Sequence, residues 1–103
     1  MIEKNKRHES KRLRDSAKGQ VCRVRLPSVC NWNPETTVLA HLGGAGMGIK
    51  KDDMQGAFSC SSCHDEVDRR TRIFEEDYVE LAFRQGVERT QSYWLQNGFI
   101  KIL

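Results

Sequence analysis

The sequence predicts a small α+β domain held together by a bound metal, and three observations support this. Short apolar stretches with alternating polar positions fill the first part of the chain, whereas residues 75–96 have the three-to-four-residue apolar spacing of an amphipathic helix. Four cysteines occur as two spaced pairs. With 103 residues and 38% hydrophobic residues, the core is thin and requires a cross-link.

The N-terminal segment is basic. Residues 1–25 contain nine Lys or Arg and three Asp or Glu, a net charge of +6, which leaves −3 for the remainder of a chain whose total is +3. We expect residues 1–12 to form a flexible basic arm and residues 13–103 to form one domain. Such an arm is either an electrostatic footprint for phosphates or a solvated tail.

A short helix is predicted where the arm meets the domain. The stretch ESKRLRDSAKG has helix-forming composition, with Leu13 and Ala17 as its residues to bury and Gly19 as its stop. The helix therefore lies on the surface and carries most of its basic residues toward solvent.

Two strands are expected from alternation. In residues 20–26, Cys22, Val24 and Leu26 fall on one face, and in residues 36–42 the β-branched pattern places His41 at the strand end. The sequence GGAGMG then ends any regular element, because such a run of glycines is typical of a loop with positive φ or of close approach to the backbone.

Two helices are predicted in the second half. Ser61 or Ser62 is available to cap a helix that begins near Cys63, and i, i+4 spacing places His64 and Asp68 on one of its faces. The amphipathic helix of residues 75–96 follows, with Gly86 as a possible bend and Asn97-Gly98 at its end. We expect Tyr93, Trp94 and Phe99 to belong to the core; the alternative is the face of a homodimer.

The cysteine spacing predicts a structural Zn²⁺ site with four ligands: Cys22, Cys30, Cys60 and Cys63. The N-terminus has no apolar signal-peptide core, so we expect a reducing compartment, where thiolates bind metal rather than form disulfides. Two alternatives are open: reduced cysteines packed in the core, or replacement of one sulfur by His64. No stretch approaches the length of about 18 apolar residues that a membrane span needs.

Two histidines are candidates for chemistry. Phosphodiester hydrolysis requires a base to activate water and a divalent cation to stabilise the phosphorane and the leaving oxygen. His41 is the candidate base, and His64 with Asp68 is the candidate site for Mg²⁺ or a similar cation. The alternative is that the histidines are structural and that Asp68 is paired with the neighbouring arginines.

These motifs resemble a known family. The order of a cysteine pair, LAHL and CSSCH resembles the HNH endonucleases, whose ββα-metal motif is often clamped by zinc. More closely, AKGQVCRVRLPSVCNWNPETTVLAHL, CSSCHDEVDRRT and RTQSYWLQNG are similar to the YbcO-like nuclease family of lambdoid prophages, over about residues 14–101. The resemblance implies an HNH-like fold between the N-terminal basic helix and the C-terminal amphipathic helix.

Carried over by position, the HNH pattern makes His41 the base and makes His64 and Asp68 metal ligands. The chain departs from the pattern at Ala40, where a ligating His or Asp is common. The middle Asn of the pattern has no clear counterpart, since no Asn lies between Leu42 and Cys63; the candidates are Asp52, Asp53 and Gln55.

The sequence therefore predicts a metal-dependent DNA endonuclease of phage or prophage origin, in the cytoplasm of a bacterial host. The alternative is a non-catalytic zinc module that binds DNA or protein. The residues expected to contact DNA phosphates are Lys11, Arg12, Arg14, Arg69 and Arg70.

Overall fold

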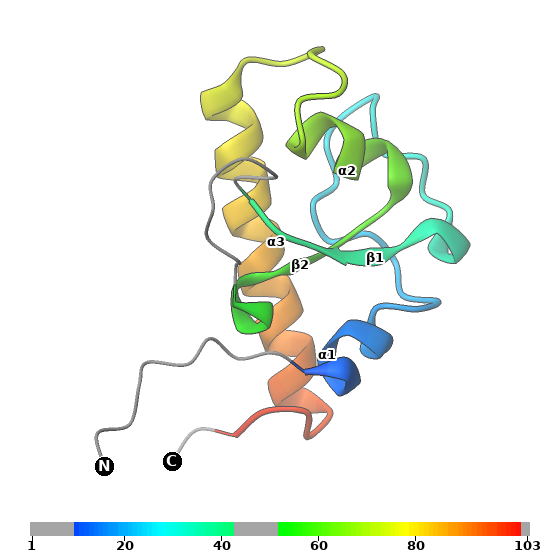
Figure 1. Ribbon diagram of the computed structural model, residues 1–103, viewed down its shortest axis with the longest axis vertical. Helices are drawn as coiled ribbons and strands as arrows, with labels where there is room; N and C mark the ends of the chain where they lie inside the picture. Colours follow the sequence, from blue (N-terminus) through cyan, green and yellow to red (C-terminus); the bar gives the residue numbers. More distant parts are fainter. Residues whose placement is uncertain (1–9, 43–51, 102–103) are drawn as a thin grey trace.

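A two-stranded antiparallel sheet lies across a long C-terminal helix in the computed structural model (Figure 1). The structure describes residues 10–42 and 52–101, so the GGAGMG segment lies outside the described residues. In chain order the elements are helix α1 (Lys11–Ser16), the 3₁₀ turn η1 (Pro34–Thr36), strand β1 (Val38–Ala40), the 3₁₀ turn η2 (Asp53–Gln55), strand β2 (Ala57–Ser59), and helices α2 (Ser61–Val67) and α3 (Glu76–Gln96). The predicted α+β class is confirmed.

Strand β2 is the centre of the fold because all three of its residues are buried. It pairs with β1 so that Leu39 faces Phe58 and Ala40 faces Ala57. Alternation along β2 sends Ala57 to one apolar cluster and Phe58 to another. The first cluster contains the cysteines and Phe83, whereas the second contains Leu13, Ala17, Phe58 and Trp94.

Helix α3 covers both clusters. Val79 and Phe83 belong to the first and Trp94 to the second. Between them, the buried Thr90 Oγ1 accepts a hydrogen bond of 3.0 Å from the backbone N–H of Phe58. A backbone group that β1 does not satisfy thus finds its partner on the helix, as buried peptide groups must.

Helix α1 begins earlier than the predicted domain boundary. Ser10 is its N-cap, accepting from the N–H of Leu13 at 3.1 Å, so Lys11 and Arg12 belong to the helix rather than to an arm. Leu13 and Ala17 are buried as predicted, and Gly19 follows the helix with a φ of 77°. The expected arm otherwise lies outside the described residues.

The predicted strand over residues 20–26 is wrong, although its burial pattern is right. Cys22, Val24 and Leu26 are buried while Arg25 is exposed, yet this segment is irregular in the structure. One bond joins it to β2, from the Arg23 N–H to the Phe58 carbonyl. The φ of 56° at Arg25 turns the backbone out of the extended conformation, so the alternation serves a turn around Cys22.

Helix α2 differs from the prediction in its cap. The helix begins at Ser61, and the Sγ of Cys60 accepts from the N–H of Cys63 at 3.4 Å. The hydroxyls of Ser61 and Ser62 instead accept from the Asn31 amide, which joins the first cysteine loop to the helix. At the other end Asp68 is the C-cap and Arg69 follows with a φ of 63°.

The aromatic residues near the C-terminus lie in the core as predicted. Trp94 is fully buried, and its indole N–H donates to Ser16 Oγ at 2.8 Å. Tyr93 packs against Phe58 and stacks on Phe99, with ring centroids 5.6 and 6.0 Å apart. The end of α3 is therefore fixed to α1 and β2.

Gly86 permits helix α3 to approach the cysteine loop, rather than bending the helix. A Cβ at this position would lie 3.0 Å from Val24 Cγ2 and 3.1 Å from Val24 Cα. We therefore expect Gly86→Val to lower the free energy of unfolding by about 2 kcal/mol or more, the range found for overpacked cores. Urea denaturation of the purified variant measures this.

The matched control is Ser92→Val, which adds a β-branched residue to the exposed side of the same helix. Intrinsic helix propensity alone changes the free energy of unfolding of either variant by only a few tenths of a kcal/mol. Equal stability of the two variants would contradict the role assigned to Gly86.

Candidate metal centre and histidine site

The four cysteine sulfurs converge at one place. Their Sγ atoms all lie within 4.8 Å of one another, and those of Cys30 and Cys60 are 3.8 Å apart. All four are free thiols, since a disulfide would require about 2.05 Å between sulfurs. Thiolates around zinc at about 2.3 Å would be about 3.8 Å from one another in a regular tetrahedron. Four cysteines in this arrangement can hold a metal such as zinc.

Two separate segments supply these sulfurs. Cys60 caps α2 and Cys63 lies in its first turn, whereas Cys22 and Cys30 come from the loop that precedes η1. Cys22, Cys60 and Cys63 are buried and Cys30 is partly buried. The Sγ of Cys22 also accepts from the N–H of Arg25 at 3.4 Å, a contact that stabilises a thiolate.

The first cysteine loop contains three non-glycine residues in the left-handed region. Arg25, Ser28 and Trp32 have φ values of 56°, 57° and 56°. Each such residue costs about 1–2 kcal/mol relative to an ordinary conformation. A metal bound to the four cysteines would offset that cost, because it would join both ends of the strained loop to α2.

The thiol pKa values show why a cation suits the cluster. The hydrogen bond with Cys63 lowers the pKa of Cys22 to about 5, and the same bond raises the pKa of Cys63 well above its usual range. Burial raises the pKa of Cys30 to about 12. Proton sharing between neighbouring sulfurs thus favours one thiolate, and a bound divalent cation would allow several to ionise together.

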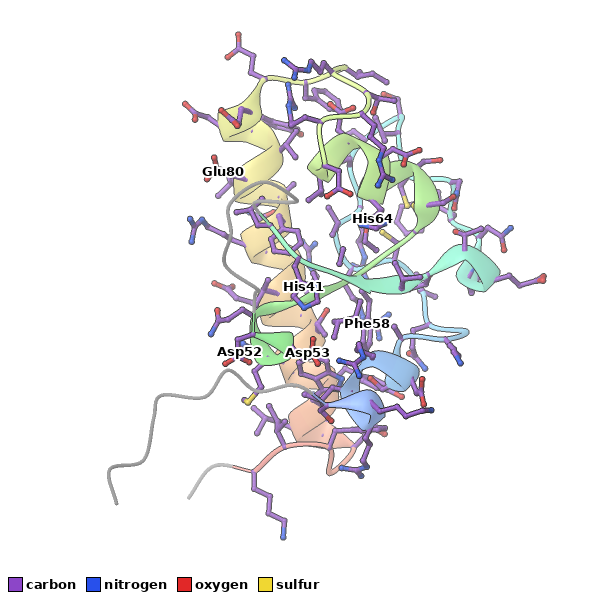
Figure 2. The ribbon with its side chains drawn as sticks, in the orientation of Figure 1. His41, Asp52, Asp53, Phe58, His64 and Glu80 are labelled. Atoms are coloured by element: carbon purple, nitrogen blue, oxygen red, sulfur yellow. The ribbon has the colours of Figure 1, made fainter. Side chains whose placement is uncertain are left out.

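His41 is paired with Asp53. Its Nε2 lies 3.1 Å from Asp53 Oδ1, and the Asp53 side chain is only 4% exposed. The other carboxylate oxygen accepts from the Ser10 N–H at 2.7 Å and from Arg14 Nη1 at 2.9 Å. Figure 2 shows His41 at the end of β1 beside Asp53 of η2. Helix α1 thus holds the carboxylate in place, and the carboxylate orients the imidazole.

His64 is paired with Asp68 on α2, as their spacing predicts. Its Nε2 lies 3.3 Å from Asp68 Oδ2. Arg70 Nη2 lies 3.4 Å from the same oxygen and forms an ion pair with it. Figure 2 shows His64 apart from His41. Within the part of the chain that the structure describes, the only group of three or more potential metal ligands is the cysteine cluster. The two histidine pairs therefore do not form one such group.

The three basic residues of α1 that were expected to contact DNA all make contacts within the chain. Lys11 pairs with Asp15 at 2.7 Å but is 82% exposed, and Arg14 pairs with Asp53. The Arg12 guanidinium lies 4.4 Å from the centre of the Phe99 ring and donates to the carbonyls after α3. Exposed ion pairs such as that of Lys11 are weak and can exchange for a phosphate.

The two arginines after α2 have different surroundings. Arg70 is 64% exposed and pairs with Asp65 at 3.2 Å. Arg69 is mostly buried, donates to the carbonyl of Phe74 and lies 3.8 Å from Glu66. Arg69 therefore stabilises the connection between α2 and α3, and Arg70 is the more available to a ligand.

Sequence reasoning did not identify the roles of two buried carboxylates. Asp53 was one of three candidates for a missing Asn, and its pairing with His41 joins residues 12 apart in the sequence. Glu66 is fully buried and accepts from Thr71 Oγ1 and the Phe74 N–H. Burial raises the Glu66 pKa, but these bonds outweigh it and lower the pKa overall. Nothing in the sequence around either residue indicated these roles.

The described part of the molecule is a small α+β domain with four cysteines that can hold a metal and a histidine–carboxylate pair at the end of its sheet. A family model described as "Putative nuclease YbcO" matches residues 11–99. The chain belongs to that family.

Relatives and a solved structure agree with this membership. Proteins carrying the same description in Escherichia coli K-12 and in Enterobacteria phage 82 are each 48% identical over 92 residues, which cover 86% of this chain and 96% of each relative. A solved structure described as "a putative bacteriophage protein" from Escherichia coli K-12 superposes with a TM-score of 0.76 at 45% identity, covering 84% of this chain and all of that one.

We expect the purified chain to contain about one zinc ion per molecule, and Cys63→Ser to lose it. Because metal binding is coupled to folding, the stripped protein unfolds at a lower temperature than the loaded one. Elemental analysis and thermal unfolding followed by circular dichroism measure both. Ser62→Ala is the adjacent control and keeps its zinc. Metal-free protein with an unchanged unfolding temperature would contradict the site.

Proposed function

We propose that this chain is a metal-dependent DNA endonuclease that uses His41 as its general base, in the cytoplasm of a bacterial host. The family description names a nuclease, and the resemblance to the HNH pattern assigns His41 to this role. The observation that carries the proposal is the buried carboxylate of Asp53 against His41 Nε2. A histidine that is fixed by a carboxylate is suited to accept a proton from water.

The pair determines which nitrogen acts. An ionised carboxylate only accepts hydrogen bonds, so the Nε2 that contacts Asp53 carries the proton and Nδ1 has the free lone pair. Nδ1 then removes a proton from the attacking water, and the imidazolium that forms is stabilised by the carboxylate. Ser10 and Arg14 prevent Asp53 from turning away, since both hold its second oxygen.

His64 and Asp68 are the proposed protein ligands of the catalytic cation. A divalent cation supplies charge stabilisation to the phosphorane and the leaving oxygen. Mg²⁺ commonly takes only one or two protein ligands and completes its shell with water and substrate phosphate. Arg70, whose own side chain is 64% exposed, must release Asp68 for this.

Structural Zn²⁺ on the four cysteines is proposed to fix the start of α2, on which His64 lies. Lys11, Arg12, Arg14, Arg69 and Arg70 are the proposed phosphate contacts, with Lys11 and Arg70 the most exposed.

A second candidate function is a non-catalytic zinc module that binds DNA or protein. It is favoured by Ala40, which is 1% exposed and offers no ligand where the pattern often has one. The absence of a second three-ligand cluster among residues 10–42 and 52–101 points the same way. The two candidates differ in one measurable property, cation-dependent strand cleavage.

We expect the wild-type protein to nick plasmid DNA with Mg²⁺ or Mn²⁺, and His41→Ala to lose at least about 10²-fold in rate, the usual contribution of a general base. Agarose-gel conversion of supercoiled plasmid measures the rate. Zinc content and unfolding temperature should be retained in the variant. Equal cleavage by His41→Ala would contradict the assignment of the base, and no cleavage by the wild type would favour the second candidate.

We expect Asp53→Asn to lower the rate by at least about tenfold at neutral pH. An amide donating to Nε2 would reverse the tautomer and leave Nδ1 protonated, so the pH–rate profile should change as well as the rate. The control is Asp52→Asn, because Asp52 caps η2 and Asn caps equally well. A profile identical to that of the wild type would show that Asp53 has only a structural role.

A further inference from the structure

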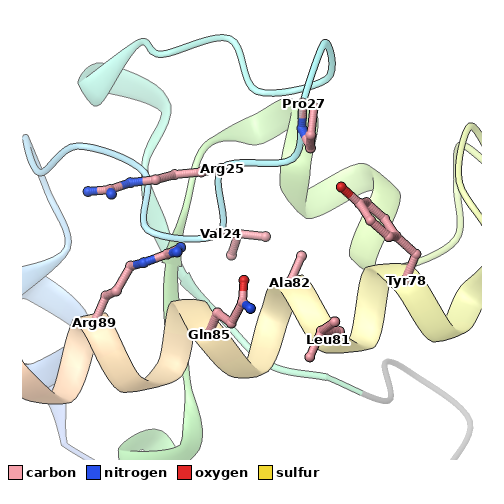
Figure 3. A pocket seen from close by; sticks show the side chains of 8 residues that line it. All are labelled: Val24, Arg25, Pro27, Tyr78, Leu81, Ala82, Gln85 and Arg89. Atoms are coloured by element: carbon pink, nitrogen blue, oxygen red, sulfur yellow. The ribbon is translucent and has the colours of Figure 1, made fainter.

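A groove alongside α3 is not used by the proposed reaction. It lies between the first cysteine loop and α3 and is lined by Val24, Arg25, Pro27, Tyr78, Leu81, Ala82, Gln85 and Arg89. Figure 3 shows Arg25 and Arg89 toward one end and Tyr78 toward the other, with Val24 and Ala82 between them. None of its lining residues belongs to the histidine pairs or the cysteine cluster.

The two arginines give one end of the groove a positive charge, and none of the lining residues is acidic. Arg25 Nε donates to the Cys22 carbonyl at 3.0 Å, and Arg89 Nη1 donates to the Arg23 carbonyl at 2.7 Å. These bonds aim the two guanidiniums while leaving their other nitrogens unpaired within the described residues. An anion between them would relieve the repulsion of like charges and gain charge-assisted hydrogen bonds.

The rest of the groove suits a flat, partly apolar group. Tyr78 is 44% exposed and Leu81 is 55% exposed, so the groove offers two large side chains with apolar surface to a ligand. Gln85 lies between the arginines and these residues and carries both a donor and an acceptor. The acidic residues Glu76 and Asp77 precede Tyr78 in the first turn of α3, so positive charge is confined to the arginine end.

We propose that this groove binds one unpaired nucleotide of the DNA substrate. Its phosphate lies between Arg25 and Arg89, its base stacks on Tyr78, and Gln85 contacts the base edge. A base can reach the ring only when it is unstacked from its neighbours, so the site selects single-stranded or branched DNA over a continuous duplex. This deepens the proposed nuclease function, because it names the structural class of the substrate.

Binding is measured by fluorescence anisotropy with full-length, zinc-loaded protein in the His41→Ala background, without added Mg²⁺, so that no cleavage occurs. The probe is a labelled single-stranded oligothymidylate about a dozen nucleotides long. Tyr78→Ala should weaken binding about tenfold, and Arg25→Gln should reduce the slope of log affinity against log salt by about 0.7. Arg84→Gln removes the same charge from α3 outside the groove and should change the affinity much less.

The same titration with a duplex of equal length tests selectivity. The groove variants should leave duplex binding within about twofold of its starting value. Equal weakening for both probes, or no weakening by Tyr78→Ala and Gln85→Ala, would overturn the proposal. Competition by an oligoglutamate peptide at equal concentration would also overturn it, since that result would assign the groove to an acidic protein segment.

This test separates the groove from the nuclease proposal. If the wild type does not cleave DNA but the groove variants lose affinity for single-stranded DNA, the endonuclease proposal is contradicted and the nucleotide-binding proposal for the groove is supported. If the wild type cleaves nicked or branched DNA and Tyr78→Ala changes neither cleavage nor affinity, the nucleotide-binding proposal for the groove is contradicted and the endonuclease proposal is supported.

Discussion

The four cysteine sulfurs connect a strained, irregular loop to the first turn of α2, and most of the fold depends on that connection. The loop supplies Val24 to the face of α3 at Gly86, and α2 continues from β2, whose residues divide the core. Without the cross-link, three left-handed residues would have little to hold them. A metal bound to these sulfurs would therefore determine how closely the loop, the sheet and the long helix can pack.

A second set of contacts lies at the opposite end of the sheet, where a carboxylate rather than the cysteine sulfurs joins the elements. Asp53 connects η2, His41 and the start of α1 through three contacts. Arg14 has two roles there, since it is a proposed phosphate contact and a partner of Asp53. A phosphate that draws Arg14 away would alter the surroundings of the histidine. Because Arg14 of α1 contacts Asp53, a phosphate that binds Arg14 would also affect the orientation of His41.

Local patterns predicted the amphipathic helix, the burial of Leu13 and Trp94, the placement of His64 and Asp68 on one face of a helix, and the convergence of the cysteines. They failed where a tertiary contact decided the outcome. Residues 20–26 alternate as a strand does, but a turn around Cys22 gives the same alternation. Cys60 caps α2 in place of the serines because the sulfur is held at that point by its neighbours. The pairing of His41 with Asp53 joins residues 12 apart across a segment with no regular pattern.

The division of the core into two clusters also separates the two tryptophans. Trp94 is fully buried in the cluster between α1 and α3, whereas Trp32 is 57% exposed and follows Cys30 in the sequence. Their emission therefore differs: one indole is shielded from water and the other is largely solvated. A change in the fluorescence emission of Trp32 reports on the cysteine loop, and a change in that of Trp94 reports on the cluster between α1 and α3. The native chain thus carries an intrinsic optical probe for each half of the molecule, so local opening near the sulfurs is distinguishable from global unfolding.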